Sequence, residues 1–359
     1  KDQYQFKLKG TGPISFHLGC DFFRDEDGYL CFAPKKYIDK MMDNYKRIFG
    51  KSPKEAVSPI EKGDHPELDT SELLDMDGTK IYQSLIGALQ WVIQIGRFDV
   101  TTAVMTMSRF RACPRQGHLD RVKRIHGYLA KFRSGVVRIN TEEPDYSSIP
   151  EKIADWFYTI YQGAREEVPQ DAPRPLGKYV RISSFFDANL MHDLISGRSV
   201  TGILHFLNKT PIDWYSKLQA TVETATFGSE YVAARTCTEQ VIDLRLTLRY
   251  LGVPIQGRAM IFGDNKTVMD TASIPQSKLH KRHNALSYHR TREAIAAGIS
   301  YLYHIRGALN PADILSKHWG HSDIWEILKP IMFWDGDSST LAKPWLENIV
   351  GEIAKAITG

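Results

Sequence analysis

Residues 199–217, SVTGILHFLNKTPIDWYSK, contain the pattern that decides the fold class of this chain. Two apolar runs, 199–207 and 211–217, lie on either side of the turn residues Asn208 and Lys209. Short runs rich in β-branched and aromatic residues, separated by a turn, are typical of neighbouring antiparallel strands. The sequence therefore predicts a β-hairpin within the second half of the chain.

The sequence on both sides extends this hairpin into a larger sheet. Residues 179–186 form another strand candidate before it, and residues 259–262 and 299–305 form two more after it. Helical apolar spacing predicts a long amphipathic helix over 234–251, and a basic helical stretch follows over 277–297. Three strands followed by alternating helices and strands predict an α/β fold, in which helices pack on a mixed sheet.

The first half has a different pattern, which predicts a mainly helical region with a small N-terminal hairpin. An apolar run over 14–22, the turn residues Asp27 and Gly28, and a second run over 29–32 predict the hairpin. Helical apolar spacing occurs in three segments, which are 37–49, 81–110 with a break near 96–99, and 118–132. Prolines and acidic residues over 51–78 indicate an exposed connector.

A proline-rich stretch separates the two patterns, because Pro169, Pro173 and Pro175 lie close together in the sequence. We therefore place the domain boundary there. The predicted parts are a mainly helical region 1–138, a linker 139–177, an α/β domain 178–320 and a C-terminal extension 321–359.

The composition is that of an ordinary soluble globular protein, with 42% hydrophobic and 25% charged residues. No apolar run approaches the ~20 residues of a membrane helix, so we expect no membrane partner. The four cysteines are scattered, which argues against a disulfide scaffold and fits a reducing compartment. A net charge of +4 is compatible with nucleic-acid binding. The polar start at Lys1, without a methionine or a signal peptide, indicates a piece of a longer precursor.

Four acidic residues stand where a fold of this order would gather them. Asp187 ends the first strand, Glu230 shares the buried stripe of the long helix, and Asp264 ends the fourth strand. Asp313 lies in the first turn of a helix that Asn310 is expected to cap. Carboxylates gathered in a partly buried site repel one another, and hard divalent cations such as Mg²⁺ or Mn²⁺ relieve that repulsion. Acids at strand ends and helix starts are also common as solvated or capping residues, so both interpretations stay open here.

Short motifs along the chain resemble those of one family of mobile elements. In chain order they are YQSLIGAL (82–89), RFDV (97–100), SRF (108–110), SKLQ (216–219), GSEY (228–231), GDN (263–265), KRHN with a later YH (281–284, 288–289) and PADILSK (311–317). They are similar to YRSLVGSL, RPDI, SRF, SKKQ, STEAEY, CDN, TKHID with YH, and LADIFTK in the Pol polyprotein of copia-type LTR retrotransposons. The chain thus resembles the C-terminal part of that polyprotein, in which the late reverse-transcriptase region is followed by ribonuclease H. The resemblance implies that residues 1–138 are a thumb- or connection-like region of a reverse transcriptase.

This resemblance implies a function and its participants. The second half is expected to have a ribonuclease H-like mixed sheet and to cleave the RNA strand of RNA–DNA hybrids with two Mg²⁺ or Mn²⁺ ions. The implied catalytic and metal-binding residues are Asp187, Glu230, Asp264 and Asp313. The implied partners are an RNA–DNA hybrid and the upstream fingers and palm of the reverse transcriptase. The implied location is a cytoplasmic retroelement particle or the nucleus, and not the secreted fraction.

The chain departs from the family pattern at two places. The polymerase signature YxDD does not occur in the sequence, so we expect no primer extension by this chain. Many ribonucleases H have a mobile histidine in the loop before the last acid, but the loop 306–310 contains none. His304 is close but is predicted to be a strand residue. We therefore expect a different product release or a lower activity.

Two basic stretches are candidates for contacts with phosphate groups. The later stretch is favoured for substrate binding, and its candidate residues are Lys278, Lys281, Arg282, His283, His289 and Arg290. For the earlier stretch, 109–133, substrate binding and a solvated helix face stay equally open. We expect Trp214 and Tyr215 to be core strand residues rather than a platform for stacked bases.

Two other functions remain open on the sequence alone. The chain could be a catalytically inactive or domesticated fragment that acts as a nucleic-acid-binding or structural module. It could also be a transposase or integrase nuclease, in which a similar fold would bring the acidic residues together. The sequence contexts of Asp264 and Asp313 favour ribonuclease H over this last alternative.

Overall fold

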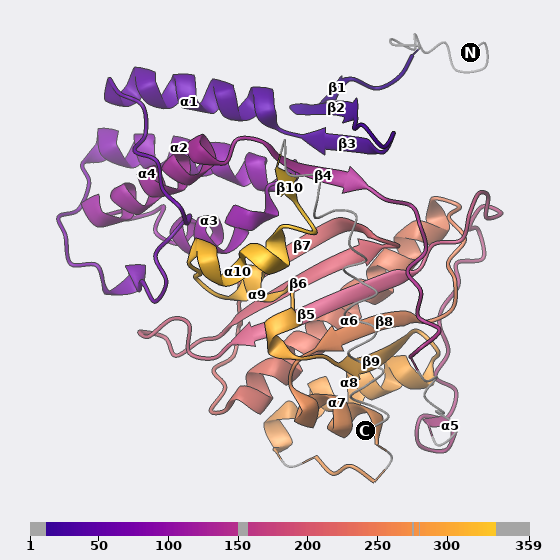
Figure 1. The fold of residues 1–359 in the computed structure, drawn as a ribbon. Coiled ribbons are helices and arrows are strands. Elements are labelled where there is room, and N and C mark those ends of the chain that lie inside the picture. The colour runs from indigo at the N-terminus through magenta and orange to yellow at the C-terminus, as the bar shows by residue number, and fades with distance from the viewer. Residues whose placement is uncertain (1–11, 150–156, 275, 280, 335–359) are drawn as a thin grey trace.

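The computed structural model describes residues 12–149, 157–274, 276–279 and 281–334, and it is drawn as a ribbon in Figure 1. Two five-stranded sheets are formed within these residues. Their order along the chain confirms the predicted α/β class, with a mixed sheet in the second half and a mainly helical region before it.

The first sheet is antiparallel, in the order β1-β2-β3-β4-β10. Its strands are β1 (Phe16–His17), β2 (Cys20–Arg24), β3 (Leu30–Ala33), β4 (Gly135–Ile139) and β10 (Phe333–Trp334). The predicted hairpin is confirmed as β2 and β3. The expectation of one strand over 14–22 is wrong, because Leu18 and Gly19 adopt positive φ values of 50° and 96° and turn the chain. Strands β4 and β10 were not predicted.

Four α-helices are described in the first half, and each overlaps a segment where helical spacing predicted one, although α2 begins at residue 76, within the predicted connector. They are α1 (Lys35–Phe49), α2 (Met76–Gln94), α3 (Thr101–Ser108) and α4 (Gln116–Lys131). The break between α2 and α3 is confirmed, and it contains the short 3₁₀ turn Phe98–Val100. Gly96 has a φ of 112° there, and a Cβ at this position would lie 2.8 Å from the Phe32 ring. Both facts require glycine at this turn.

The second sheet is mixed, in the order β7-β6-β5-β8-β9 (Figure 1). Its strands are β5 (Ile182–Asn189), β6 (Val200–Leu207), β7 (Thr210–Leu218), β8 (Ala259–Gly263) and β9 (Ser300–His304). The strands β5, β6 and β7 form an antiparallel meander, whereas β8 pairs parallel to β5 and β9 pairs parallel to β8. The parallel pairs bring the carboxyl ends of β5 and β8 to the same edge of the sheet.

The helices of the second half are α5 (Phe157–Ile160), α6 (Thr226–Tyr250), α7 (Lys266–Ser273), α8 (Ala285–Ala296), α9 (Asp313–Ser316) and α10 (His321–Leu328). Helices α6, α7, α8 and α9 contact the mixed sheet, whereas α5 packs against α8. The long helix α6 packs against β5 and β6, whereas α9 packs against β6, β5 and β7 and also contacts α3. The close approach of α9 requires Gly202 on β6, because a Cβ there would lie 2.7 Å from the carbonyl oxygen of Ala312.

The helix predicted over 277–297 begins later than expected, and α7 was not predicted. Residues Arg282–Asn284 form a 3₁₀ turn, and α8 begins at Ala285. Side chains of this turn and of the residue before it bind the segment that precedes α6. His283 contacts Glu223, and Lys281 contacts Thr224. These contacts join the turn before α8 to the segment before α6.

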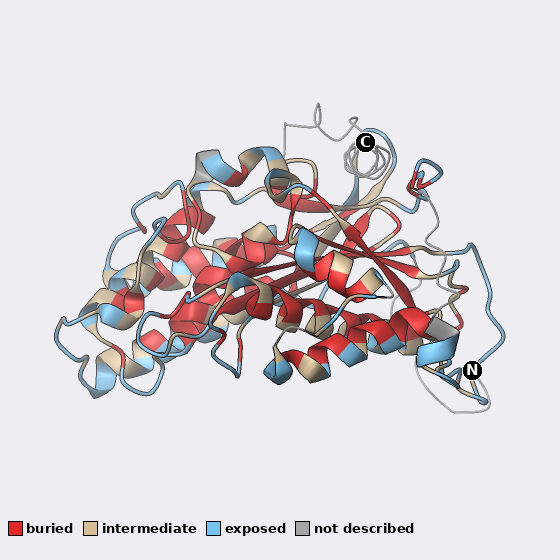
Figure 2. Ribbon diagram, turned by 90° about the horizontal axis from the view of Figure 1, so that it is seen from below, coloured by how far each residue is buried: buried red, intermediate tan, exposed pale blue. Residues whose placement is uncertain are grey.

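Buried side chains from both halves belong to one hydrophobic cluster. Figure 2 shows the buried residues in red along the helices and the sheet. The division of the chain into four parts stays a prediction, and residues 335–359 of the predicted extension lie outside the described residues. Among the helices that the structure describes, none combines the length and apolar character needed to span a membrane.

Candidate active site

Three of the predicted acids come from neighbouring elements of the mixed sheet. Asp187 lies two residues before the end of β5, and Asp264 directly follows β8. Because β5 and β8 are parallel neighbours, both side chains lie at the same edge of the sheet. Glu230 lies near the N-terminal end of α6, which packs against β5. The fold therefore gathers residues that are 43 and 34 positions apart along the chain (230 − 187 and 264 − 230).

The three side chains form a compact carboxylate group, which we call the acidic cluster: Asp187, Glu230 and Asp264. One oxygen from each lies within 4.8 Å of the others. Asp187 and Glu230 are buried, with 1% and 3% of their surfaces exposed. Such close burial of three acids is unfavourable unless protons or cations neutralise them.

The pKa values of Glu230 and Asp264 reflect this crowding. Burial raises the pKa of Glu230 well above its usual value, and the carboxylates of Asp187 and Asp264 raise it further. Burial also raises the pKa of Asp264, and Asp187 adds to the effect. Desolvation and like-charge repulsion therefore act in the same direction, and both would be relieved by a bound cation.

Asp313, the fourth predicted acid, is not one of the three residues within 4.8 Å of one another. It begins α9, and a lysine connects it to the cluster. The ammonium nitrogen of Lys317 lies 2.7 Å from Asp313 Oδ1 and 3.2 Å from Asp187 Oδ2. Three of the four predicted acids therefore form the compact group, and Asp313 is connected to Asp187 through Lys317. That all four act in one metal site stays a prediction. Asn310 was expected to cap this helix at its start, but α9 begins three residues later, and Asn310 accepts from the backbone N–H of Ala312 instead.

Lys317 was not singled out in the sequence as a site residue. Burial lowers the pKa of its ammonium group, but the carboxylates of Asp187 and Asp313 raise it by more, so the pKa is raised overall. Lys317 therefore keeps its positive charge between two acids. Only the PADILSK motif could have identified it, since its i,i+4 spacing from Asp313 places both on one helical face.

Further contacts fix the acids in place. The Ser316 hydroxyl donates a hydrogen bond to Asp187 Oδ2. The ring nitrogen Nε2 of His304 lies 3.0 Å from the backbone carbonyl of Asp264, and His304 belongs to β9 as predicted. A Cβ at Gly307 would lie 3.0 Å from Asp264 Oδ2, so glycine leaves space beside this carboxylate.

The residues present fit a hard divalent cation. The Glu230 oxygen Oε2 is buried and has no hydrogen-bond partner within the described part of the chain. It lies in a group of carboxylate oxygens, which are the ligands that Mg²⁺ and Mn²⁺ prefer. An orphaned buried acceptor is costly, and coordination of a cation would satisfy it.

The metal-free protein is expected to lose stability as pH rises from about 4 to about 7. Burial, with Asp187 close by, raises the pKa of Asp313 from 3.8 to about 7. Between these values the folded state holds a proton that the unfolded chain has released, so each pH step favours unfolding. Thermal unfolding in EDTA from pH 4 to 8 measures this, with Asp313→Asn as the reference. A stability difference between the two proteins that does not change with pH would contradict the assignment, and Mg²⁺ should restore wild-type stability above pH 7.

The predicted nucleic-acid contacts lie on and before α8. Exposed side chains among them are Lys278, Arg282, His283 and His289, while Lys281 and Arg290 are half-buried. Several have protein partners within 3.3 Å, which are Thr224 for Lys281, Glu223 for His283, Tyr161 for His289 and Glu293 for Arg290. Because Glu223 and Thr224 directly precede α6, the basic segment lies against the helix that carries Glu230.

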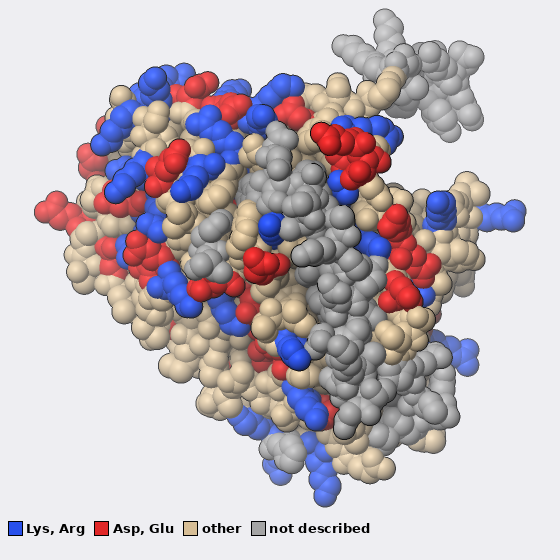
Figure 3. Space-filling model, in the orientation of Figure 1, with Lys and Arg blue, Asp and Glu red and all other residues tan. Residues whose placement is uncertain are grey.

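The earlier basic stretch is largely paired with acids of the first half. Arg121 binds both Asp64 and Asp69, at 2.6 and 2.7 Å, and Arg124 binds Glu61 at 2.9 Å. Basic and acidic side chains alternate over the helical region on the face drawn in Figure 3. These pairs join α4 to the connector 51–75, which favours the structural interpretation of this stretch.

Comparison with known proteins agrees with the sequence motifs. The chain is 24% identical over 319 residues, 87% of its length, to the retrovirus-related Pol polyprotein from transposon TNT 1-94 of Nicotiana tabacum. It is 22% identical over 313 residues, again 87% of its length, to the retrovirus-related Pol polyprotein from transposon RE1 of Arabidopsis thaliana. The resemblance to retrotransposon Pol polyproteins is confirmed. The chain spans about a fifth of these polyproteins, 21% and 18% of their lengths.

Two other comparisons add little. No family model matches the chain. A solved structure of LC11-RNase H1 in complex with an RNA/DNA hybrid aligns with 38% of this chain and 94% of its own, at 14% identity and a TM-score of 0.31.

Proposed function

We propose that this chain is a metal-dependent endonuclease that cleaves the RNA strand of RNA–DNA hybrids. The observation that supports this most is the acidic cluster, in which oxygens of Asp187, Glu230 and Asp264 lie within 4.8 Å of one another. The cluster occurs in a chain similar to retrotransposon Pol polyproteins, which makes nucleic acid the substrate class to test first. The same similarity supports an upstream reverse-transcriptase region as its partner.

The residues of the cluster would each have a defined task. Asp187, Glu230 and Asp264 would hold the metal, with Asp313 at the edge of the site. Two divalent cations bound there would supply a Lewis acid for the leaving oxygen and a water of lowered pKa for the attack on phosphorus. Burial and like charge raise the pKa values of Glu230 and Asp264, and a bound cation would favour their charged forms.

Lys317 supports the same chemistry from the protein side. Its ammonium group lies 3.2 Å from Asp187 and 2.7 Å from Asp313, so it offsets negative charge where a phosphodiester must approach. Without this charge, the buried acids would repel the substrate. Lys317 therefore orients two acids and reduces the barrier to substrate entry.

Incubation of the purified chain with an RNA–DNA hybrid and Mg²⁺ tests the proposal. An endonuclease shortens the RNA strand at internal positions and leaves the DNA strand intact. An inactive binding module retards the hybrid in a gel and leaves both strands whole. Cleavage of the DNA strand would indicate a transposase- or integrase-like nuclease instead. Single-stranded RNA and duplex DNA serve as substrate controls.

Neutralising the basic segment should weaken hybrid binding and flatten its salt dependence. The variant carries Lys281→Gln, Arg282→Gln and Arg290→Gln. Removal of one phosphate contact should make the slope of log affinity against log salt shallower by about 0.9, because fewer counterions are released. Binding measured in EDTA at several salt concentrations gives both quantities.

A matched control carries three changes on exposed lysines outside this segment, Lys35→Gln, Lys51→Gln and Lys266→Gln. It has the same net charge as the triple variant, so it separates the effect of where the charges lie from the effect of total charge. If the triple variant and this control show equal affinity and an equal salt slope, the segment is only a solvated face.

A further inference from the structure

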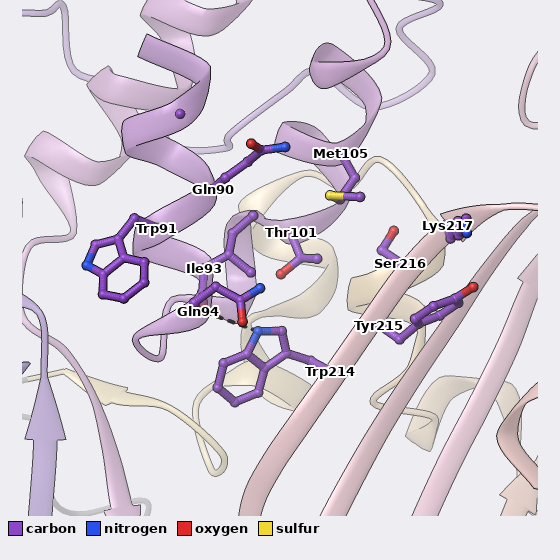
Figure 4. Close-up of a pocket in the computed structure, with 11 residues that line it drawn as sticks. Gln90, Trp91, Ile93, Gln94, Thr101, Met105, Trp214, Tyr215, Ser216 and Lys217 are labelled. Atoms are coloured by element: carbon purple, nitrogen blue, oxygen red, sulfur yellow. Dashed lines mark hydrogen bonds between the residues drawn. The ribbon is translucent and has the colours of Figure 1, made fainter. Parts of the chain in front are cut away.

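A groove with a volume of about 520 Å³ lies between the helical region and the edge strand of the mixed sheet. Its walls come from α2, α3 and β7, which belong to the two halves of the chain (Figure 4). It is separate from the acidic cluster, and none of the functions derived above uses it.

Aromatic rings form part of its surface. Trp91 on α2 is 39% exposed, and Trp214 and Tyr215 on β7 are half-buried. The Trp214 indole N–H donates to the Ile93 carbonyl at 3.1 Å, and its ring packs 5.3 Å from the Phe98 ring. These contacts fix the indole in one orientation, so little conformational entropy remains to be lost when a planar ligand stacks nearby. Trp214 and Tyr215 pack against the core, as predicted, and they also line this groove.

Polar side chains complete the lining of the groove, and the charged one among them is positive. Gln90 and Gln94 line the helical side, and their amides can both donate and accept hydrogen bonds. Lys217 lines the strand side and is exposed. Among the described residues that line the groove, none is Asp or Glu. A ligand with flat apolar faces, polar edges and negative charge matches this combination.

The strand register relates the groove to the acidic cluster. Asp187 on β5 is paired with Gly202 on β6, and Gly202 is paired with Ser216 on β7, which lines the groove. Two strand spacings of ~4.8 Å place Ser216 roughly 10 Å from Asp187 across the sheet. Helix α9 packs on β6 between these two residues, with the Ala312 carbonyl against Gly202, so the groove and the acidic cluster are separate sites on the mixed sheet.

We propose that this groove binds unpaired nucleotides of a single strand. The bases would stack on the exposed indole of Trp91 and the ring face of Trp214, while Lys217 contacts the phosphate backbone. Stacking of this kind tolerates any base, because every base has a π-face. The choice of a nucleic acid as the occupant rests on the proposed function, whereas the groove and its lining do not.

Binding of a single-stranded oligo(dT) of about 12 nucleotides, measured in EDTA, tests this proposal. DNA is used as the probe because the proposed nuclease cleaves RNA. The variant Trp91→Ala with Lys217→Gln should bind about tenfold more weakly than the wild type. Trp91→Phe should keep most of the affinity, because it retains an aromatic face. Matched controls outside the groove, Tyr250→Ala and Lys51→Gln, should bind as the wild type does. Unfolding temperatures show that each variant is folded.

An abasic oligonucleotide of the same length separates stacking from charge attraction. The wild type should bind it more weakly than oligo(dT), and Trp91→Ala should not weaken it further. Equal binding of the two oligonucleotides by the wild type would overturn the proposal, as would an unchanged affinity of the double variant for oligo(dT). Hybrid cleavage is measured in parallel. Cleavage of the hybrid without binding of oligo(dT) would refute only the groove proposal. Binding of oligo(dT) without cleavage of the hybrid would refute only the proposed nuclease function.

Discussion

Replacing Asp264 with asparagine should reduce hybrid cleavage by roughly 1000-fold or more, because the loss of a metal site removes several kcal/mol of transition-state stabilisation. The asparagine amide has nearly the same shape as the carboxylate but no negative charge to hold a cation. The fold should be unaffected or slightly more stable without metal, since burial and Asp187 make the Asp264 carboxylate unfavourable in the folded protein. Single-turnover cleavage with Mg²⁺ and a thermal unfolding curve in EDTA measure the two effects.

The matched control is Asp243→Asn, an exposed aspartate on α6 outside the acidic cluster. It changes the net charge equally and should cleave the hybrid at the wild-type rate. Wild-type cleavage by Asp264→Asn would remove this residue from the site. Loss of cleavage in both variants would show that net charge rather than metal binding controls the rate.

Replacing Asp99 with alanine should destabilise the protein by about 3–5 kcal/mol, the usual cost of removing one partner of a buried ion pair. Arg97 and Asp99 are almost fully buried, with 0% and 1% of their surfaces exposed. Two hydrogen bonds of 2.9 and 2.7 Å join them, and Arg97 also donates to the Phe132 carbonyl at 2.7 Å. In the variant, the guanidinium stays out of water but no longer has the Asp99 carboxylate to balance its charge.

Urea unfolding with tryptophan fluorescence measures this loss. Asp77→Ala serves as the control, because the Asp77–Lys80 pair lies on the surface and should contribute little. A double variant, Arg97→Met with Asp99→Leu, should recover much of the stability, since neither charge of the pair then remains buried. An Asp99→Ala protein as stable as the wild type would show that the RFDV motif does not stabilise the junction between α2 and α3.

The strands and helices with strong periodicity could be predicted from the sequence. The meander of β5, β6 and β7 and the helix α6 follow from alternating or helical apolar runs separated by turn residues. The strands β4 and β10 could not, because they are short and pair with partners more than 100 residues away. Local patterns carry no information on such distant pairing.

The acidic cluster was predictable only in part. Asp187 and Asp264 each come directly after an apolar run in the sequence, and parallel pairing of β5 and β8 brings such positions together. The different environment of Asp313 could not be foreseen, because it depends on where the Lys317 side chain lies in the folded protein. The groove at Trp214 was missed for a related reason. A half-buried tryptophan on a strand looks like a core residue until the packing of α2 against β7 is known.

Strand-specific cleavage tests the central claim most directly. A hybrid labelled separately on its RNA and DNA strands is incubated with the purified chain in Mg²⁺ and, in a parallel reaction, in EDTA. The account predicts internal cleavage of the RNA strand in Mg²⁺, an intact DNA strand, and no cleavage of either strand in EDTA. RNA that stays whole in Mg²⁺ while the hybrid is demonstrably bound, or cleavage that proceeds equally in EDTA, would contradict it.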